Sequence, residues 1–148
     1  GRLVTEAHTV NLFQGMETGR SLLSDNNLKI VFESDYPPAQ LRLFIDQLDP
    51  AYFGINYDSG NSAALGYDPE VEIKTYGDRI YNVHVKDRLL GGTTVPLGTG
   101  NANLPRVFEL LQTIEYSGQY ILQTARATDG DHAGALCRYR DQVRQWLA

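Results

Sequence analysis

Four polar side chains occupy positions from which they could bind a metal ion together. Each ends or directly follows a short apolar segment with the composition of a β-strand; they are Glu33, Asp58, His84 and Gln123. Neighbouring members are about one strand-plus-helix unit apart, and the last interval is longer because it contains the Gly/Thr-rich segment Gly91–Asn103. Two carboxylates, an imidazole and an amide oxygen make a suitable ligand set for a divalent cation. The residue types therefore predict a metal site.

Each of these residues taken alone also fits a purely structural role. Glu33 could be a solvated loop acid, Asp58 a turn residue, and His84 a buried histidine with satisfied hydrogen bonds. Their common position at the ends of successive strands favours the metal-binding interpretation, because the C-terminal ends of parallel strands meet at one rim of a sheet.

The segments that must position these side chains alternate between strand and helix. The predicted strands are Leu28–Phe32, Tyr52–Tyr57, Arg79–Val85 and Gly118–Leu122. The predicted helices are Ala39–Leu48, Pro69–Gly77 with Asp68 as N-cap, Leu104–Ile114 and His132–Leu147. This alternation predicts an α/β fold with a parallel sheet, because parallel strands need crossover connections. The strands are mostly apolar, which is typical of strands covered on both faces.

Composition limits the class of protein. The chain has 148 residues, enough for one domain, with 42% hydrophobic and 21% charged residues. The net charge of -5 argues against a nucleic-acid partner, and no apolar stretch is long enough to cross a membrane. The single cysteine, Cys137, excludes an internal disulfide and is expected to be a buried or semi-buried structural thiol in the last helix. We expect a cytoplasmic protein.

The N-terminal segment has two interpretations. The run Asn11–Gly15 before Met16 resembles a degraded protease-site linker from an expression vector. One hypothesis is therefore that residues 1–15 are vector-derived and that residues 16–148 form the domain. The alternative takes Leu3–Phe13 as a first strand.

Several motifs resemble one family. They are FESD, NYDSGN, NVHVKDR, PLGTGN and, after a helix, GQYILQT. Together they resemble the C-terminal half of the xylose isomerase-like TIM barrel superfamily, which includes sugar phosphate isomerases/epimerases and the family 2 AP endonucleases. The resemblance covers Leu28 to Leu147, and VHVKDR followed by PLGTG is its most specific part. It implies a parallel (βα)4 half of a TIM barrel.

The resemblance also implies a metal site and a reaction. Members of the superfamily bind a divalent ion (Mn, Co, Zn or Mg) through Glu, Asp, His and a second Glu, and the two glutamates move a proton next to a sugar carbonyl. The first three ligands correspond to Glu33, Asp58 and His84, with Glu33 also catalytic, whereas the second glutamate corresponds to Gln123. Glutamine can coordinate a metal but cannot accept a proton, so a two-base epimerase is in doubt while a one-base isomerisation by Glu33 is not.

Three basic residues near these positions are candidates for substrate binding. Lys86, Arg88 and Arg126 are expected to hold a phosphate or hydroxyl of the substrate. The alternative is a surface charge or an ion pair with Asp87 or Asp129. The run Asp129–His132 resembles a metal cluster by composition, but we interpret it as a turn followed by a helix N-cap.

The predicted half-barrel leads to an expectation about association. A full barrel takes about 250 residues, so four units alone would leave two open edges and an exposed apolar inner face. Two copies could close a barrel by two-fold symmetry, as a homodimer or a domain-swapped oligomer.

Two function hypotheses follow from this reasoning. The first is a metal-dependent isomerase or epimerase of a sugar or sugar phosphate; the second is an inactive half-barrel that self-associates or binds a small molecule. The endonuclease branch is disfavoured by the acidic charge and by the lack of further histidine ligands.

Overall fold

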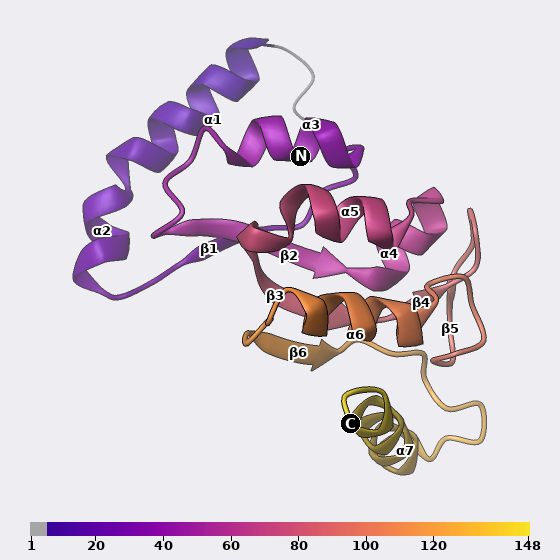
Figure 1. The fold of residues 1–148 in the computed structure, drawn as a ribbon. Helices are drawn as coiled ribbons and strands as arrows, with labels where there is room; N and C mark the ends of the chain where they lie inside the picture. Colours follow the sequence, from indigo (N-terminus) through magenta and orange to yellow (C-terminus); the bar gives the residue numbers. More distant parts are fainter. Residues whose placement is uncertain (1–5) are drawn as a thin grey trace.

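The computed structural model describes residues 6–148, which form a curved parallel sheet with helices packed on it (Figure 1). The strand order is β1-β2-β3-β6, and all neighbouring pairs are parallel. The strands are β1 (Ile30–Phe32), β2 (Phe53–Asp58), β3 (Ile80–Val85) and β6 (Gln119–Leu122). A separate antiparallel pair consists of β4 (Asp87–Arg88) and β5 (Thr94–Val95). The four predicted parallel strands are therefore present, each with slightly different bounds.

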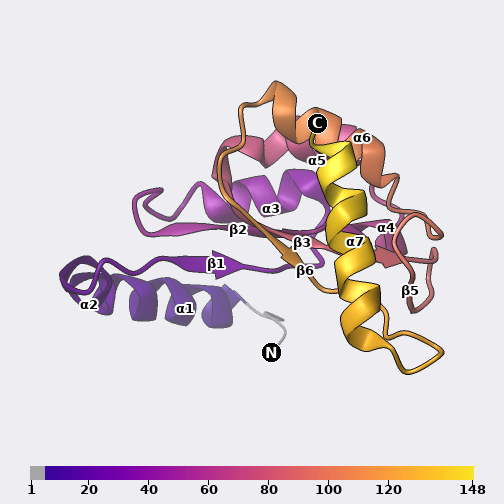
Figure 2. The ribbon, with the colours of Figure 1, turned by 90° about the horizontal axis from the view of Figure 1, so that it is seen from below.

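The helices are α1 (Glu6–Thr18), α2 (Arg20–Asp25), α3 (Pro38–Ile45), α4 (Ser59–Leu65), α5 (Pro69–Tyr76), the 3-10 helix η1 (Gly77–Arg79), α6 (Leu104–Thr113) and α7 (His132–Trp146). The four predicted helices are present as α3, α5, α6 and α7, and the structure adds helices that the sequence did not predict. Figure 2 shows α3, α5 and α6 along one side of the sheet and α7 beside β6. Asp68 caps α5 by accepting from the Glu70 N–H, as predicted. Among residues 6–148, no helix combines the length and the apolarity needed to cross a membrane.

The strands β2 and β3 have one apolar and one polar face. On the apolar face, Phe53 packs on Phe32, which meets Phe44 of α3 at 5.2 Å between ring centroids. Burying each such side chain contributes about 1.5–3 kcal/mol. The register pairs Asn56 with Asn82 on the opposite face. The expectation of an apolar inner face is therefore wrong at the centre of the sheet, where hydrogen-bonded polar groups replace aliphatic side chains.

The N-terminal segment is helical where the structure describes it. Residues 6–13, which one interpretation assigned to a strand, lie in α1, so that interpretation is wrong for them; residues 3–5 lie outside the described part. Phe13 of α1 stacks near Phe44 of α3, with ring centroids 5.5 Å apart. Through this contact α1 packs against α3 and does not extend the sheet.

The loop after β3 is organised by a buried carboxylate. Asp87 is 1% exposed and accepts hydrogen bonds from the backbone N–H groups of Gly98, Gly100 and Ala102, at 2.8–3.1 Å. A Cβ on Gly100 would lie 2.2 Å from the Asp87 Oδ1, so only glycine fits there. Asp87 therefore shapes the segment that follows β4, and the alternative of an ion pair between Asp87 and Lys86 or Arg88 is wrong.

Two expectations about the C-terminal helix have opposite outcomes. Asp131 caps α7 by accepting from the Gly134 N–H, as predicted for the turn and cap. Cys137, however, is exposed, which contradicts the expected buried or semi-buried thiol. Ala135 and Val143 are the buried residues of α7, and Cys137 lies on a different face of the helix.

Candidate metal centre

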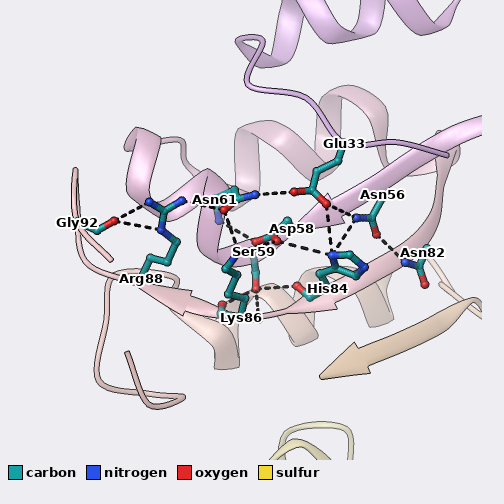
Figure 3. A network of polar contacts seen from close by, with 10 residues as sticks. All are labelled: Glu33, Asn56, Asp58, Ser59, Asn61, Asn82, His84, Lys86, Arg88 and Gly92. Carbon is teal, nitrogen blue, oxygen red and sulfur yellow. Dashed lines mark hydrogen bonds and ion pairs between the residues drawn. The ribbon is translucent and has the colours of Figure 1, made fainter. Parts of the chain in front are cut away.

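Three of the predicted ligands converge at the C-terminal rim of the sheet. Glu33 follows β1, Asp58 ends β2, and His84 pairs with Asp58 across β2 and β3. Each offers a ligand atom, and these atoms lie within 4.8 Å of one another. The His84 Nδ1 is 3.3 Å from the Glu33 Oε2 and 3.7 Å from the Asp58 Oδ2 (Figure 3). The side chains are 41%, 1% and 20% exposed for Glu33, Asp58 and His84, so the group opens to solvent on the Glu33 side.

The donor set fits a divalent cation. Carboxylate oxygens and an imidazole nitrogen are ligands for Zn, Mn and related metals. The arrangement places these acceptor atoms face to face, and lone pairs at such distances repel unless a cation or a proton lies between them. In the part of the chain that the structure describes, this is the one group of three or more His, Cys, Asp or Glu residues with such convergence.

Two asparagines that the sequence interpretation missed support the triad of Glu33, Asp58 and His84. The Asn56 Nδ2 donates to the Glu33 Oε2 at 2.7 Å and lies 3.1 Å from the His84 Nδ1. The Asn82 Nδ2 donates to the Asn56 Oδ1 at 2.6 Å, which fixes the orientation of the Asn56 amide. The pair therefore holds Glu33 and His84 in place from the polar face of the sheet.

Asp58 is a member of the triad and is also the N-cap of α4. Its Oδ1 accepts from the backbone N–H of Asn61 at 2.8 Å and so caps α4, a helix that is absent from the predicted elements. Its Oδ2 faces His84 and the Lys86 Nζ, the latter at 3.4 Å. Asp58 can therefore serve in both of the roles considered for it: Oδ1 holds the turn into α4, and Oδ2 can act as a ligand atom beside His84.

The adjacent Ser59 ties α4 to the end of β3. Its hydroxyl lies 3.1 Å from the His84 carbonyl oxygen and 2.7 Å from that of Lys86, and it accepts from the Lys86 N–H at 3.1 Å. This residue is 2% exposed. One buried hydroxyl therefore joins the start of α4 to the backbone at the end of β3, beside the candidate ligands.

The basic residues differ in their distance from the triad. Lys86 contacts Asp58 directly, whereas Arg88 donates to the Gly92 carbonyl oxygen and to the Asn61 Oδ1. Arg126 is exposed in the loop between β6 and α7, and no contact joins it to the triad within residues 6–148. The structure thus brings Lys86 and Arg88, but not Arg126, into the polar network.

Gln123 lies beside this network without joining it. Its backbone N–H donates to the Val85 carbonyl oxygen at 3.1 Å, which extends the pairing of β6 with β3 by one residue. Ile121 pairs with His84, so Gln123, two residues further, faces the same side of the sheet. The residue is exposed, and in the described part of the chain its side chain makes none of the hydrogen bonds of the triad.

A buried acid lies below the site. Glu72 of α5 is 1% exposed and accepts from the hydroxyls of Tyr57, Ser62 and Tyr76, at 2.7–3.3 Å. Burial raises the pKa of Glu72, and burial together with the adjacent carboxylate raises the pKa of both tyrosines. A pocket of about 10 Å³ is lined by Glu33 and by the Tyr57, Ser62 and Tyr76 of this cluster. The cluster joins α4, α5 and β2 under the triad.

Parallel strand–helix units with polar side chains gathered at the C-terminal rim are the arrangement of part of a βα barrel. The family model described as xylose isomerase-like TIM barrel matches residues 10–147. The chain therefore belongs to this family. The match begins inside residues 1–15, whose vector origin stays a prediction.

One curated relative and two solved structures are similar to this chain. It is 32% identical over 102 residues to L-ribulose-5-phosphate 3-epimerase UlaE of Escherichia coli, a match that covers 68% of this chain and 36% of that protein. The fold resembles a xylose isomerase domain protein from Planctomyces limnophilus (TM-score 0.81, 18% identity, 99% of this chain and 56% of that one). It also resembles D-allulose 3-epimerase from Methylomonas sp. (TM-score 0.67, 19% identity, 92% and 49%). At these identities the two structures support the fold alone.

Proposed function

We propose that this chain carries the metal-binding half of an isomerase or epimerase that acts on a sugar or sugar phosphate by proton transfer next to a carbonyl. The convergence of Glu33, Asp58 and His84 at one rim is the observation that carries this proposal. The match to a pentulose phosphate epimerase supports the substrate class. A divalent cation would be held by these three side chains, with Gln123 as a fourth ligand through its amide oxygen.

The roles of the residues follow from their chemistry. The cation, when bound, polarises the sugar carbonyl and stabilises the negative charge that develops on it. Glu33 is the proton acceptor, because it is the more exposed of the two carboxylates and its two oxygens are fixed by Asn61 and Asn56. Lys86, which contacts Asp58, and Arg88 would orient phosphate or hydroxyl groups of the substrate. Arg126, exposed in the loop between β6 and α7, is proposed as a third substrate-binding residue.

Exchange of a substrate proton with solvent tests the proposal. In D2O, the Mn²⁺-loaded chain should catalyse the incorporation of deuterium into a 2-ketose or its phosphate, at the carbon next to the carbonyl. L-ribulose 5-phosphate and D-allulose are the first probes. Glu33→Gln should lower this rate by about 10²–10⁴-fold, the usual contribution of a general base. Mass spectrometry or NMR measures the incorporation.

The second candidate function is a binding module without catalysis, and Gln123 is the observation that favours it, because an amide cannot accept a proton. Binding of a ketose to the Mn²⁺-loaded chain without any deuterium incorporation would establish this function instead.

We also propose that two copies of the chain complete one barrel. Within residues 6–148, the outer edges of β1 and β6 have no strand partner. Val31 and Ile121, on these two strands, are 38% and 44% exposed. Pairing these edges would cover both side chains. Light scattering should give the mass of a dimer, with and without Mn²⁺; a monomer would contradict the proposal and assign the open edges to another segment or partner.

A further inference from the structure

The side-chain amide of Asn61 lies between two cations and the proposed base (Figure 3). Its Oδ1 accepts from the Arg88 Nη1 at 2.8 Å and from the Lys86 Nζ at 3.2 Å. Its Nδ2 donates to the Glu33 Oε1 at 2.6 Å. One neutral amide thus contacts two positive charges at its oxygen and one negative charge at its nitrogen.

The charges on both sides fix the orientation of this amide. A flipped Asn61 would direct its NH2 group at Lys86 and Arg88, which have only donors, and its oxygen at the Glu33 carboxylate, which has only acceptors. Cations bound at the oxygen also polarise the amide and strengthen the hydrogen bond that its nitrogen donates. Both effects act on the Glu33 Oε1.

Arg88 is itself held in place by the loop that follows it. Its Nε and Nη2 both donate to the Gly92 carbonyl oxygen, at 3.1 and 2.6 Å. Its backbone carbonyl accepts from the Asn101 N–H at 2.9 Å. Of its five N–H donors, three are used by protein partners, so Arg88 is a fixed part of the network with donors left for a substrate.

Asn61 also separates the cations from Glu33. A lysine or arginine in direct contact with Glu33 would occupy its lone pairs and compete with a metal ion for them. Because Asn61 lies between, Glu33 receives a neutral donor at Oε1, while Oε2 faces His84 and Asn56. The two oxygens therefore have different partners, as a residue that serves as both ligand and base requires.

We infer that Asn61 is a positioning residue through which Arg88 and Lys86 orient Glu33 without pairing with it. The inference rests on the proposed function for its purpose. It gives Arg88 a role before any substrate is bound, in addition to contact with a substrate.

A double-mutant cycle on Mn²⁺ affinity in the absence of substrate tests this role. Asn61→Ala and Arg88→Ala should each weaken Mn²⁺ binding, by about 10–100-fold, the usual effect of residues that support metal ligands. If Arg88 acts through Asn61, adding Arg88→Ala to Asn61→Ala should cause no further loss. Asn26→Ala is the matched control, since Asn26 is exposed and, within residues 6–148, its side chain bonds only to the Leu22 carbonyl oxygen. Unchanged affinity in Asn61→Ala, or independent losses that add in the double variant, would overturn the inference.

A second measurement needs no metal and separates this inference from the proposed function. In the metal-free wild type, NMR should show slow solvent exchange of the Asn61 side-chain N–H protons, and Arg88→Ala should accelerate that exchange about tenfold or more, the effect of losing a hydrogen-bond energy of roughly 1.5 kcal/mol. If wild type binds no Mn²⁺ but this coupling is present, the metal proposal fails and the positioning network stands. Fast exchange in the wild type, or no response to Arg88→Ala, overturns the network.

Discussion

Asp58→Asn is expected to weaken Mn²⁺ binding by more than about 100-fold, beyond the 10–100-fold typical of residues that only support ligands. The Asp58 side chain is 1% exposed, and its Oδ2 is one of the three converging acceptors. Asparagine has nearly the same shape and caps helices as well as aspartate does, so α4 should persist. The substitution therefore removes the negative charge from the site while the fold is retained. Calorimetric titration measures the affinity, and circular dichroism measures the fold.

The chain offers a matched control for this substitution at Asp68. Asp68 caps α5, through the Glu70 N–H, in the same way that Asp58 caps α4. Asp68→Asn makes the same chemical change at a helix N-cap outside the triad, and it should leave Mn²⁺ affinity unchanged. Equal affinities for Asp58→Asn and wild type would remove Asp58 from the metal site; equal losses in both variants would indicate a general charge effect.

The convergence of Glu33, Asp58 and His84 could be predicted because it needs only strand order and direction. A parallel sheet brings the ends of its strands to one rim, whatever the details of the loops. Predicting the supporting asparagines would have needed one more step, which is to apply the two-residue period of a strand. Asn56 and Asn82 precede Asp58 and His84 by two positions and so share their face.

The contacts of Asn61 and Arg88 could not be predicted in the same way. They depend on α4, whose sequence SGNSAAL has no apolar stripe and too few residues for a periodic pattern. They also depend on the loop that Asp87 holds, and three backbone donors converging on one carboxylate leave no pattern in the sequence. The two-residue strands β4 and β5 were missed for the same reason.

The N-terminal helix shows how packing can override local sequence signals. The segment that forms α1 contains two threonines, a valine and a glycine, which are weak helix formers. Its aromatic contact with α3 supplies stability that a local pattern does not express.

Gln123→Glu is expected to give the site the second base that it lacks. The strand order places β1 and β6 at opposite edges of the sheet, so Glu33 and residue 123 would flank a substrate bound over Asp58 and His84. A single base returns a proton to the face from which it was taken, whereas inversion needs a group on the other face. The variant should therefore bind Mn²⁺ more tightly, because an added carboxylate raises ligand charge, and should form the epimer about 10²–10⁴-fold faster than wild type.

Gln119→Glu provides the matched control for this gain. Gln119 begins β6, four residues before Gln123 and on the same face; it lies opposite Asn82 rather than at the rim and is likewise exposed. The same added charge there should change neither Mn²⁺ affinity nor the stereochemistry of the product. Chromatographic separation of the two epimers measures the outcome. Epimer formation in Gln123→Glu alone would show that the missing acid/base group is what limits wild type. An inactive Gln123→Glu variant that still binds Mn²⁺ would instead mean that a second proton acceptor at this rim is insufficient, and the binding-module function would then account better for a site that holds a metal without turning over a sugar.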